Sequence, residues 1–424
     1  MDMQYRKLPH GEEQISILGL GTSSIGMAEG REIEATVTLA LENGVNFFDM
    51  ASADAAPFPA YGRAMAGARD KVYFQIHFGA DYHSGKYGWT TDLDAIKRSI
   101  DWQLSALRTD YIDFGFLHCI DEESDLHQII DSGVLDYIRQ LQQAGVVRHI
   151  GLSSHTPRVA NQVLDMGVLD LLMFSINPGY DYHHGEFAIG AADERMALYR
   201  RCEAEGVGIS VMKAFSGGQL LDARTSPFGQ ALTEYQCIQY ALDKPGVLTV
   251  LPGVRNRADL QRILGFLHAS PEERDYSILG TFAPQDASGI CVYCNHCQPC
   301  PAGLDVGIIN KYYDLARAGD ELARGHYDKL EKKAGDCIGC GHCDRRCPFH
   351  VAQAGRMKEI QAYFGAQPAA AAALPACHPQ GVFIYQRFTA YFPSFPANCV
   401  LSGQFFEFVR HHIASFSPLC YNAP

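Results

Sequence analysis

Short runs of apolar, β-branched and aromatic residues alternate with segments of helical periodicity over the first 270 residues. The apolar runs are 16–24, 45–50, 71–79, 110–118, 146–154, 168–177, 206–214 and 246–254. The helical segments that follow them are 31–43, 60–68, 91–107, 131–144, 156–167, 194–205, 228–243 and 257–267. Near-continuous apolar strands are typical of parallel sheets covered by helices, and eight such units close a barrel. The pattern therefore predicts an α/β fold, a (β/α)8 TIM barrel.

An open doubly wound sheet is the alternative, but no G-x-G-x-x-G follows the first apolar run. In a barrel of this kind the chemistry lies where the strands end, at the C-terminal face. Polar residues stand at the ends of six of the predicted strands: Asp49, His77, His118, Ser153, Asn177 and Lys213. Each of them also has a structural interpretation, as a cap of the next helix or a partner of a loop.

Eight of the 14 cysteines form two runs after the predicted barrel. The runs are Cys291, Cys294, Cys297 and Cys300, followed by Pro301, and Cys337, Cys340, Cys343 and Cys347, followed by Pro348. Thiolates two residues apart can converge on one cluster, and the second run has the spacing of bacterial ferredoxins. The sequence thus predicts two 4Fe-4S clusters, whose default role is electron transfer. Clusters that only fix the C-terminal part in place are the alternative.

The Cys-Pro steps suggest how the ligands are shared between the clusters. In two-cluster ferredoxins the fourth cysteine of a run binds the other cluster, which would pair Cys347 with the first run and Cys300 with the second. A pair of zinc sites is the competing interpretation, but zinc needs no Cys-Pro signature. A disulfide framework is less favoured, because residues 1–7 lack an apolar signal segment. We therefore expect a cytoplasmic protein.

Charge and hydropathy exclude two classes of partner. The formal net charge is −13 and the sequence pI is about 5.7, which argues against a nucleic-acid partner. No run reaches the roughly 18 apolar residues of a membrane span. We expect a soluble protein that acts on a small molecule and exchanges electrons with a ferredoxin or another redox partner.

At the strand-end residues the chain resembles the aldo/keto reductases, specifically the branch with a C-terminal dicluster ferredoxin-like domain. The likeness covers about residues 4–365. The motifs that carry it are 19–22, 44–49, 110–113, 117–118, 151–154, 212–213, 252–256 and 297–301. The resemblance implies domains at 1–280 for the barrel and 281–365 for a small α-helical ferredoxin-like module. In this module an apolar stripe at helical spacing predicts helices at 306–318 and 321–333. Residues 366–424 change abruptly in composition, and we assign this tail no function.

The family reduces carbonyls with NADPH through a tetrad of Asp, Tyr, Lys and His, in which Tyr donates the proton. Asp49 and His118 match the first and last members. In an ungapped alignment the tyrosine falls on Asp54 and the lysine falls on His77. An aspartate of ordinary pKa, about 3.9, is ionised at neutral pH and cannot donate a proton, whereas histidine, at about 6.5, can. Asp49, Asp54, His77 and His118 are thus either a rewired acid–base site or the remains of one.

The resemblance also implies positions for NADP(H). Arg255 and Asn256 suit the adenosine 2′-phosphate, the loop at Ser216 and Gly217 suits the pyrophosphate, and Ser153 and Asn177 suit the nicotinamide amide. Helix capping and a tight turn explain the same residue types equally well. Hydride carries two electrons and each cluster accepts one, so a flavin is the candidate mediator, although the sequence shows no flavin motif.

Three functions follow. The leading hypothesis is an iron–sulfur oxidoreductase of the aldo/keto reductase type, with a small carbonyl substrate in the barrel mouth and electron transfer through two clusters. The second is ordinary NADPH-dependent carbonyl reduction with a rewired acid–base site. The third is a non-catalytic electron carrier or redox sensor on a degenerate barrel.

Overall fold

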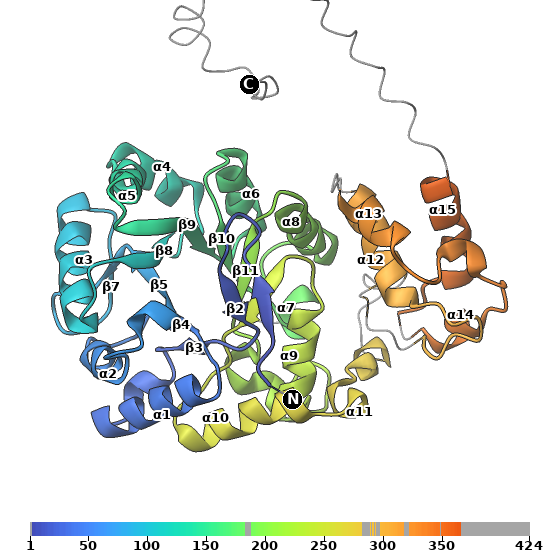
Figure 1. Ribbon diagram of the computed structural model, residues 1–424, viewed down its shortest axis with the longest axis horizontal. Helices are drawn as coiled ribbons and strands as arrows, with labels where there is room; N and C mark the ends of the chain where they lie inside the picture. The colour runs from blue at the N-terminus through green and yellow to red at the C-terminus, as the bar shows by residue number, and fades with distance from the viewer. Residues whose placement is uncertain are drawn as a thin grey trace, which may run out of the picture. The chain divides into compact units, whose positions relative to one another are not determined.

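The computed structural model describes residues 2–182, 188–281, 289, 291, 293, 297–317, 322–347 and 349–365. One sheet contains eight strands: β3 (Leu20–Gly21), β4 (Phe47–Met50), β5 (Tyr73–Phe78), β8 (Ile112–Leu117), β9 (Val147–Ser154), β10 (Leu171–Ser175), β11 (Gly208–Met212) and β12 (Val247–Val250). All neighbouring strands in it are parallel. The sheet closes where Leu18 pairs with Val250, whose N–H donates to the carbonyl of Ile17 at 2.9 Å. The predicted (β/α)8 barrel is confirmed (Figure 1).

Helices cover the outside of the sheet: α1 (Gly30–Glu42), α2 (Pro57–Ala64), α3 (Leu93–Leu107), α4 (Glu123–Asp131), α5 (Val134–Gln143), α6 (Pro157–Asp165), α8 (Ala192–Ala204), α9 (Glu234–Leu242) and α10 (Arg257–Leu264). The helix predicted at 131–144 is α5, whereas α4 was not predicted. The two helices are separated at Gly133, where φ is 77°. Glycine adopts this left-handed conformation without the cost that a side chain imposes.

A hairpin of two short strands closes the end of the barrel at which the parallel strands begin. Strands β1 (Tyr5–Lys7) and β2 (Gln14–Ser16) form an antiparallel hairpin. Leu8 and Ile15 from this hairpin are fully buried in one apolar cluster with Phe47, Phe114 and Leu171 of the barrel. The barrel interior at the strand starts is thus filled by apolar side chains, and the predicted polar residues lie toward the opposite end.

A second hairpin, which the sequence did not predict, lies between β5 and α3. Its strands are β6 (Ala80–Asp81) and β7 (Gly88–Trp89), with Ala80 paired to Trp89. The backbone of Tyr87 donates to the carbonyl of Ala53 at 3.1 Å, and Trp89 Nε1 donates to the carbonyl of His118 at 3.1 Å. The hairpin is thereby tied to the loops that follow β4 and β8.

A buried charge network fixes the helices beneath β10. Asp181, at the end of α7 (Pro178–Asp181), accepts hydrogen bonds from Arg195 Nε at 2.8 Å, Tyr199 at 2.6 Å and Tyr240 at 2.8 Å. Arg195 is fully buried and also donates to the carbonyl of Ile189. Each charge has its partners, which is the condition under which buried ions are tolerated.

The C-terminal part is helical. It contains α12 (Val306–Arg317), α13 (Leu322–Asp328), α14 (His342–Arg346) and α15 (Gln353–Gly365). The first two match the predicted helices 306–318 and 321–333, although the second ends five residues early; α15 was not predicted. Asp314 on α12 accepts from Tyr293 at 2.9 Å and pairs with Arg200 of the barrel at 3.5 Å. The tail at 366–424 lies outside the described residues.

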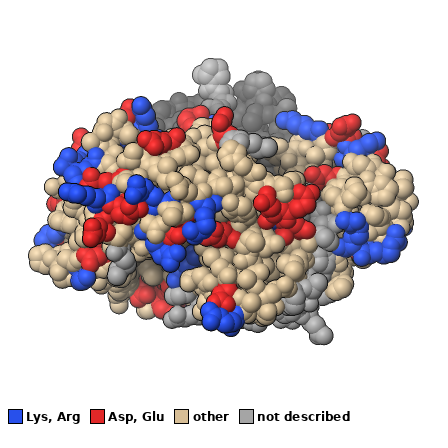
Figure 2. All heavy atoms as spheres, turned by 90° about the horizontal axis from the view of Figure 1, so that it is seen from below, with Lys and Arg blue, Asp and Glu red and all other residues tan. Residues whose placement is uncertain are grey.

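Charges of both signs are interspersed on the surface shown in Figure 2. Surface ion pairs of this kind include Arg63 with Glu34 at 2.7 Å and Arg257 with Glu32 at 3.0 Å. Exposed pairs contribute little to stability, so the packed barrel core dominates it. Among the described helices, none combines the length and apolar character that a bilayer crossing requires.

Candidate active site

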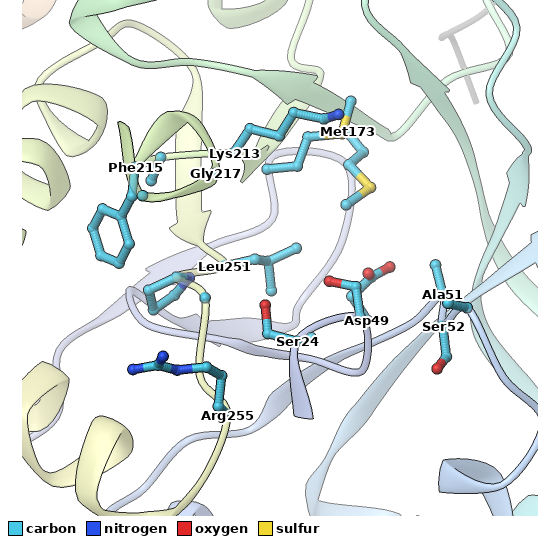
Figure 3. Close-up of a pocket in the computed structure, with 18 of the residues that line it drawn as sticks. Ser24, Asp49, Ala51, Ser52, Met173, Lys213, Phe215, Gly217, Leu251 and Arg255 are labelled. Carbon is cyan, nitrogen blue, oxygen red and sulfur yellow. The ribbon is translucent and has the colours of Figure 1, made fainter. Parts of the chain in front are cut away.

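A cavity of about 780 Å³ opens at the ends of the barrel strands. It is lined from the loops after β4, β5, β8, β9, β11 and β12, and apolar side chains such as Met173 and Leu251 form part of its wall. Figure 3 shows Lys213 and Met173 across the cavity from Asp49, with Arg255 toward its other end. Pockets for small ligands and cofactors are usually about 300–1,000 Å³. The cavity is large enough for a substrate together with part of a cofactor.

Three of the predicted catalytic residues form a hydrogen-bonded row at the floor of this cavity. Asp49 Oδ1 lies 2.7 Å from His77 Nε2, and His77 Nδ1 lies 2.9 Å from His118 Nδ1. All three side chains are buried, with 4%, 1% and 7% of their surface exposed, respectively. Gln75 Nε2 also donates to Asp49 Oδ1 at 2.7 Å, and Ser210 holds the other end of that amide at 2.9 Å.

The direction of these hydrogen bonds follows from the carboxylate of Asp49, which can only accept. His77 must therefore carry a proton on Nε2. When His77 is neutral its Nδ1 is an acceptor, so His118 donates from Nδ1 and leaves its own Nε2 to accept. Burial lowers the pKa of His118 well below its usual 6.5, and the charge of His77 lowers it further. His118 is therefore neutral at physiological pH.

Tyr87, which the sequence analysis missed, completes the row. Its hydroxyl lies 2.8 Å from His118 Nε2, and it lines the cavity from the β6–β7 hairpin. Burial raises the pKa of Tyr87 to about 12, with a smaller contribution from Cys119, so the hydroxyl is protonated at neutral pH. A tyrosine 38 positions beyond Asp49 in a loop of no clear periodicity carries no sequence signal that marks it for this site.

Asp54 is the predicted catalytic residue that the structure does not bring to this row. Its carboxylate pairs with Lys86 on the rim, and the hydrogen bond from Lys86 holds the pKa of Asp54 below its usual range. Asp54 is not among the described residues that line the cavity. Tyr61, another tyrosine near Asp54 in the sequence, is fully buried in α2, and its hydroxyl lies 3.3 Å from the carbonyl of Gly21.

A second polar group lies beside His118. His155 Nδ1 is 2.9 Å from Asp121 Oδ2, and Cys119 lies 3.7 Å from the same oxygen. Burial opposes ionisation of Asp121, but the hydrogen bonds from His155 lower its pKa nevertheless. Cys119 has a φ of 52°, and Lys213 and Ser216 at the cavity have φ of 57° and 50°. Such left-handed backbone in non-glycine residues is costly and is concentrated at functional sites.

The residues proposed for NADP(H) fall into two groups. Ser153, Gly217 and Arg255 line the cavity. Gly217 has a φ of 65°, which suits glycine, and open space above its Cα would let a ligand approach the backbone. Asn177 and Asn256 instead cap helices α7 and α10 by accepting from Tyr180 N and Asp259 N.

The other side chains considered for nucleotide binding already have hydrogen-bond or ion-pair partners within the protein. Ser216 donates to Gln219 at 3.3 Å. Arg255 and Arg262 both bind Asp259, and the bond from Arg255 is the main reason that the pKa of Asp259 falls to about 2. A phosphate at this end of the cavity would have to share the two guanidinium groups with that carboxylate.

The described cysteines fall into two groups, and Cys297, which the crossed arrangement assigns to the cluster of Cys291, lies in the same buried cluster as Cys343. Cys300 of the first run lines one small cavity together with Cys337, Cys340 and Cys343 of the second run. Cys347 belongs to the same buried cluster as Cys291, and Gln353 Nε2 lies 3.6 Å from Cys291 Sγ. Four thiols around one cavity fit a 4Fe-4S cluster. Cys294 lies outside the described residues.

Two family models match the sequence. Residues 17–236 match the model described as the aldo/keto reductase family, and residues 290–352 match a 4Fe-4S dicluster domain. Together they account for the barrel and for the two cysteine runs.

Similar proteins agree with the first model. An uncharacterized oxidoreductase of Bacillus subtilis is 28% identical over 176 residues, which are 40% of this chain and 56% of that protein. L-galactose dehydrogenase of Arabidopsis thaliana is 28% identical over 187 residues, with the same coverage of 40% and 56%. The chain thus spans little more than half the length of these relatives. The holo form of an aldo-keto reductase of Bacillus halodurans superposes with a TM-score of 0.53 at 23% identity, covering 66% of this chain and 97% of that one.

Proposed function

The chain belongs to the aldo/keto reductase family and carries a C-terminal 4Fe-4S dicluster domain, and from this premise we propose that the oxidoreductase interconverts a small carbonyl compound and its alcohol in the barrel mouth. We further propose that two 4Fe-4S clusters exchange electrons with the site. The observation that carries the proposal is the row from Asp49 through His77 to His118, which ends in the cavity. Such a row can hold and move a proton at His118 Nε2.

The cavity also suits the other requirements of the reaction. Met173, Met212 and Leu251 give it an apolar wall that excludes water from the reacting atoms. Lys213 adds a positive charge to this wall, which would favour the negative charge that develops on a carbonyl oxygen during reduction.

Ser153, Gly217 and Arg255 would hold NADP(H), which supplies hydride when bound. Asn177, Ser216 and Asn256 would act indirectly, because their described bonds shape the loops around the cavity. A flavin in the same cavity is the alternative carrier between two-electron and one-electron chemistry.

The eight cysteines of the two runs would hold the clusters, with Cys347 and Cys300 exchanged between them; clusters of this type supply one-electron transfer. Cys291 and Cys347 lie in the apolar cluster that includes the barrel, whereas Cys297, Cys300, Cys337 and Cys343 belong to a separate one. Cys340 is exposed. This arrangement favours one cluster near the barrel and one that an external ferredoxin-like partner can reach.

A His118→Gln variant separates an enzyme from a non-catalytic carrier. The assay is reduction of 4-nitrobenzaldehyde by NADPH under anaerobic conditions, with His127→Gln, an exposed residue of α4, as the control. Loss of turnover in His118→Gln with the iron content unchanged supports the enzyme. A wild-type protein that accepts electrons at its clusters and turns over neither the aldehyde nor the alcohol supports the carrier.

A further inference from the structure

The β6–β7 hairpin supplies a tyrosine, Tyr87, to the cavity, whereas the position aligned with the family's tyrosine is Asp54. The hydroxyl of Tyr87 lies 2.8 Å from His118 Nε2 and faces the cavity. We propose that Tyr87 exchanges the proton with the substrate oxygen and that His118, His77 and Asp49 relay protons behind it. The inference rests on the proposed carbonyl chemistry, and it assigns that chemistry to a residue from a different segment of the chain.

Asp54 helps to hold the segment that carries Tyr87 in position. Its carboxylate pairs with Lys86, the neighbour of Tyr87, and residues 54 and 86 form an antiparallel bridge. The backbone of Tyr87 donates to Ala53, next to Asp54. The aspartate at the family's tyrosine position therefore anchors the segment that supplies a new tyrosine. Asp54 is a positioning residue, since it touches neither the row nor, among the described residues, the cavity wall.

The row has two forms that differ in direction. With both histidines neutral, every donor points toward Asp49: Tyr87 O–H to His118 Nε2, His118 Nδ1–H to His77 Nδ1, and His77 Nε2–H to the carboxylate. With a second proton on His77, the two bonds beyond His77 reverse. His118 then donates from Nε2 to the phenol oxygen, and the hydroxyl of Tyr87 is free to point at a substrate.

Reduction uses the second form. A bound nicotinamide would supply the hydride that the carbonyl carbon receives, and would be oxidised in doing so. The O–H bond of Tyr87 breaks and its proton goes to the carbonyl oxygen. The phenolate takes the proton from His118 Nε2, and His118 Nδ1 takes one from His77. His77 is left neutral, with its remaining proton bonded to Asp49. Alcohol oxidation is the reverse, in which the phenol oxygen accepts the substrate proton.

The test compares Tyr87→Phe with Tyr137→Phe, which changes a half-buried tyrosine on α5 that is not among the described residues lining the cavity. In the holoenzyme, Tyr87→Phe is expected to lower kcat for 4-nitrobenzaldehyde by about 10²–10⁴-fold while KM changes little, because general acid catalysis is worth that much. Tyr137→Phe should match the wild type. A kcat for Tyr87→Phe within about threefold of wild type would overturn the proposal.

A second measurement needs no substrate. In ¹⁵N-histidine-labelled protein, with signals assigned from His77→Gln and His118→Gln, His118 Nε2 should be unprotonated and should shift when Tyr87 becomes Phe. An unchanged Nε2 signal, or a proton on Nε2 in the neutral form, would overturn the relay. If the wild type reduces no aldehyde, the proposed function fails, and the ¹⁵N result alone decides whether the relay exists.

Discussion

His77 and His118 face each other through their Nδ1 atoms at 2.9 Å, so a single proton lies between them. Because Asp49 fixes the proton on the far side of His77, the position of this one proton sets the direction of the row as far as Tyr87. In the proposed function this row is the acid–base device, and it contains neither the family's aligned tyrosine nor its lysine.

Asp49→Asn should impair catalysis far more than Asp54→Asn. The amide of Asn can donate to His77 Nε2 and so reverse its tautomer, and the loss of a carboxylate in a comparable Asp-His unit costs about 10⁴ in kcat. Asp54→Asn removes the ion pair with Lys86 that helps to anchor the Tyr87 segment, but Tyr87 keeps its backbone bond to Ala53, so the segment stays in place and the loss is small. Steady-state kinetics of the two variants at one pH provide the comparison, and equal losses would mean that Asp54 belongs to the catalytic row.

His118 should make the protein sensitive to acid. Its pKa is lowered in the folded state, so the unfolded chain binds the proton more readily, and folding stability is fully present above about pH 6.5. As the pH falls below 6.5 toward the folded pKa, stability should decline by up to about 1.4 kcal/mol per pH unit. Urea unfolding of wild type and His118→Gln between pH 7.5 and 5.5 measures this, and parallel curves for the two proteins would contradict it.

Asp181→Ala should destabilise the barrel by about 3–5 kcal/mol, because it leaves the buried guanidinium of Arg195 without its carboxylate. Tyr199→Phe is the matched control, since it removes one hydrogen bond to the same oxygen and should cost about 1 kcal/mol. Chemical denaturation gives both values. A similar cost for the two variants would show that the ion pair is not the main partner.

Cys300→Ala and Cys347→Ala should each damage the cluster of the other run. Cys300 shares a cavity with Cys337, Cys340 and Cys343, so Cys300→Ala should alter the signal that is also lost in Cys340→Ala. EPR of the reduced proteins, with Cys237→Ala as a buried control outside the runs, distinguishes the two clusters. If Cys347→Ala alters the signal that is lost in Cys340→Ala and Cys300→Ala leaves it unchanged, each cluster is bound by a single run.

Gln353→Leu should lower the reduction potential of the cluster that Cys291 binds. The amide of Gln353 is buried and points at Cys291 Sγ, and a donor near a cluster sulfur favours the reduced, more negative state. Gln361→Leu, an exposed change on the same helix α15, is the control. An EPR-monitored redox titration in which both variants match the wild type would exclude a role for this hydrogen bond.

The barrel could be predicted because its strands are continuous apolar runs that are buried on both faces. In β8, for example, all six residues are buried. Helix α4 was missed because only Leu126 and Ile129 of its nine residues are buried, which leaves little apolar periodicity in the sequence. The positions of Asp49, His77 and His118 followed from strand ends, since a parallel barrel brings such ends together.

Tyr87 could not be predicted, for a physical reason. The strands β6 and β7 have two residues each, too few for an alternating pattern, and their pairing depends on contacts with loops far away in the sequence. The ungapped alignment pointed to Asp54. This residue lies beside the Tyr87 segment in space but 33 residues before Tyr87 in the chain.

Anaerobic reconstitution with iron and sulfide, followed by addition of NADPH, measures the coupling between the barrel site and the clusters. We expect about eight irons per chain and a loss of cluster absorbance with a new EPR signal when NADPH is added. Clusters that form and respond to dithionite or a reduced ferredoxin, but to neither NADPH nor NADH, would contradict the proposed coupling between the barrel site and the clusters.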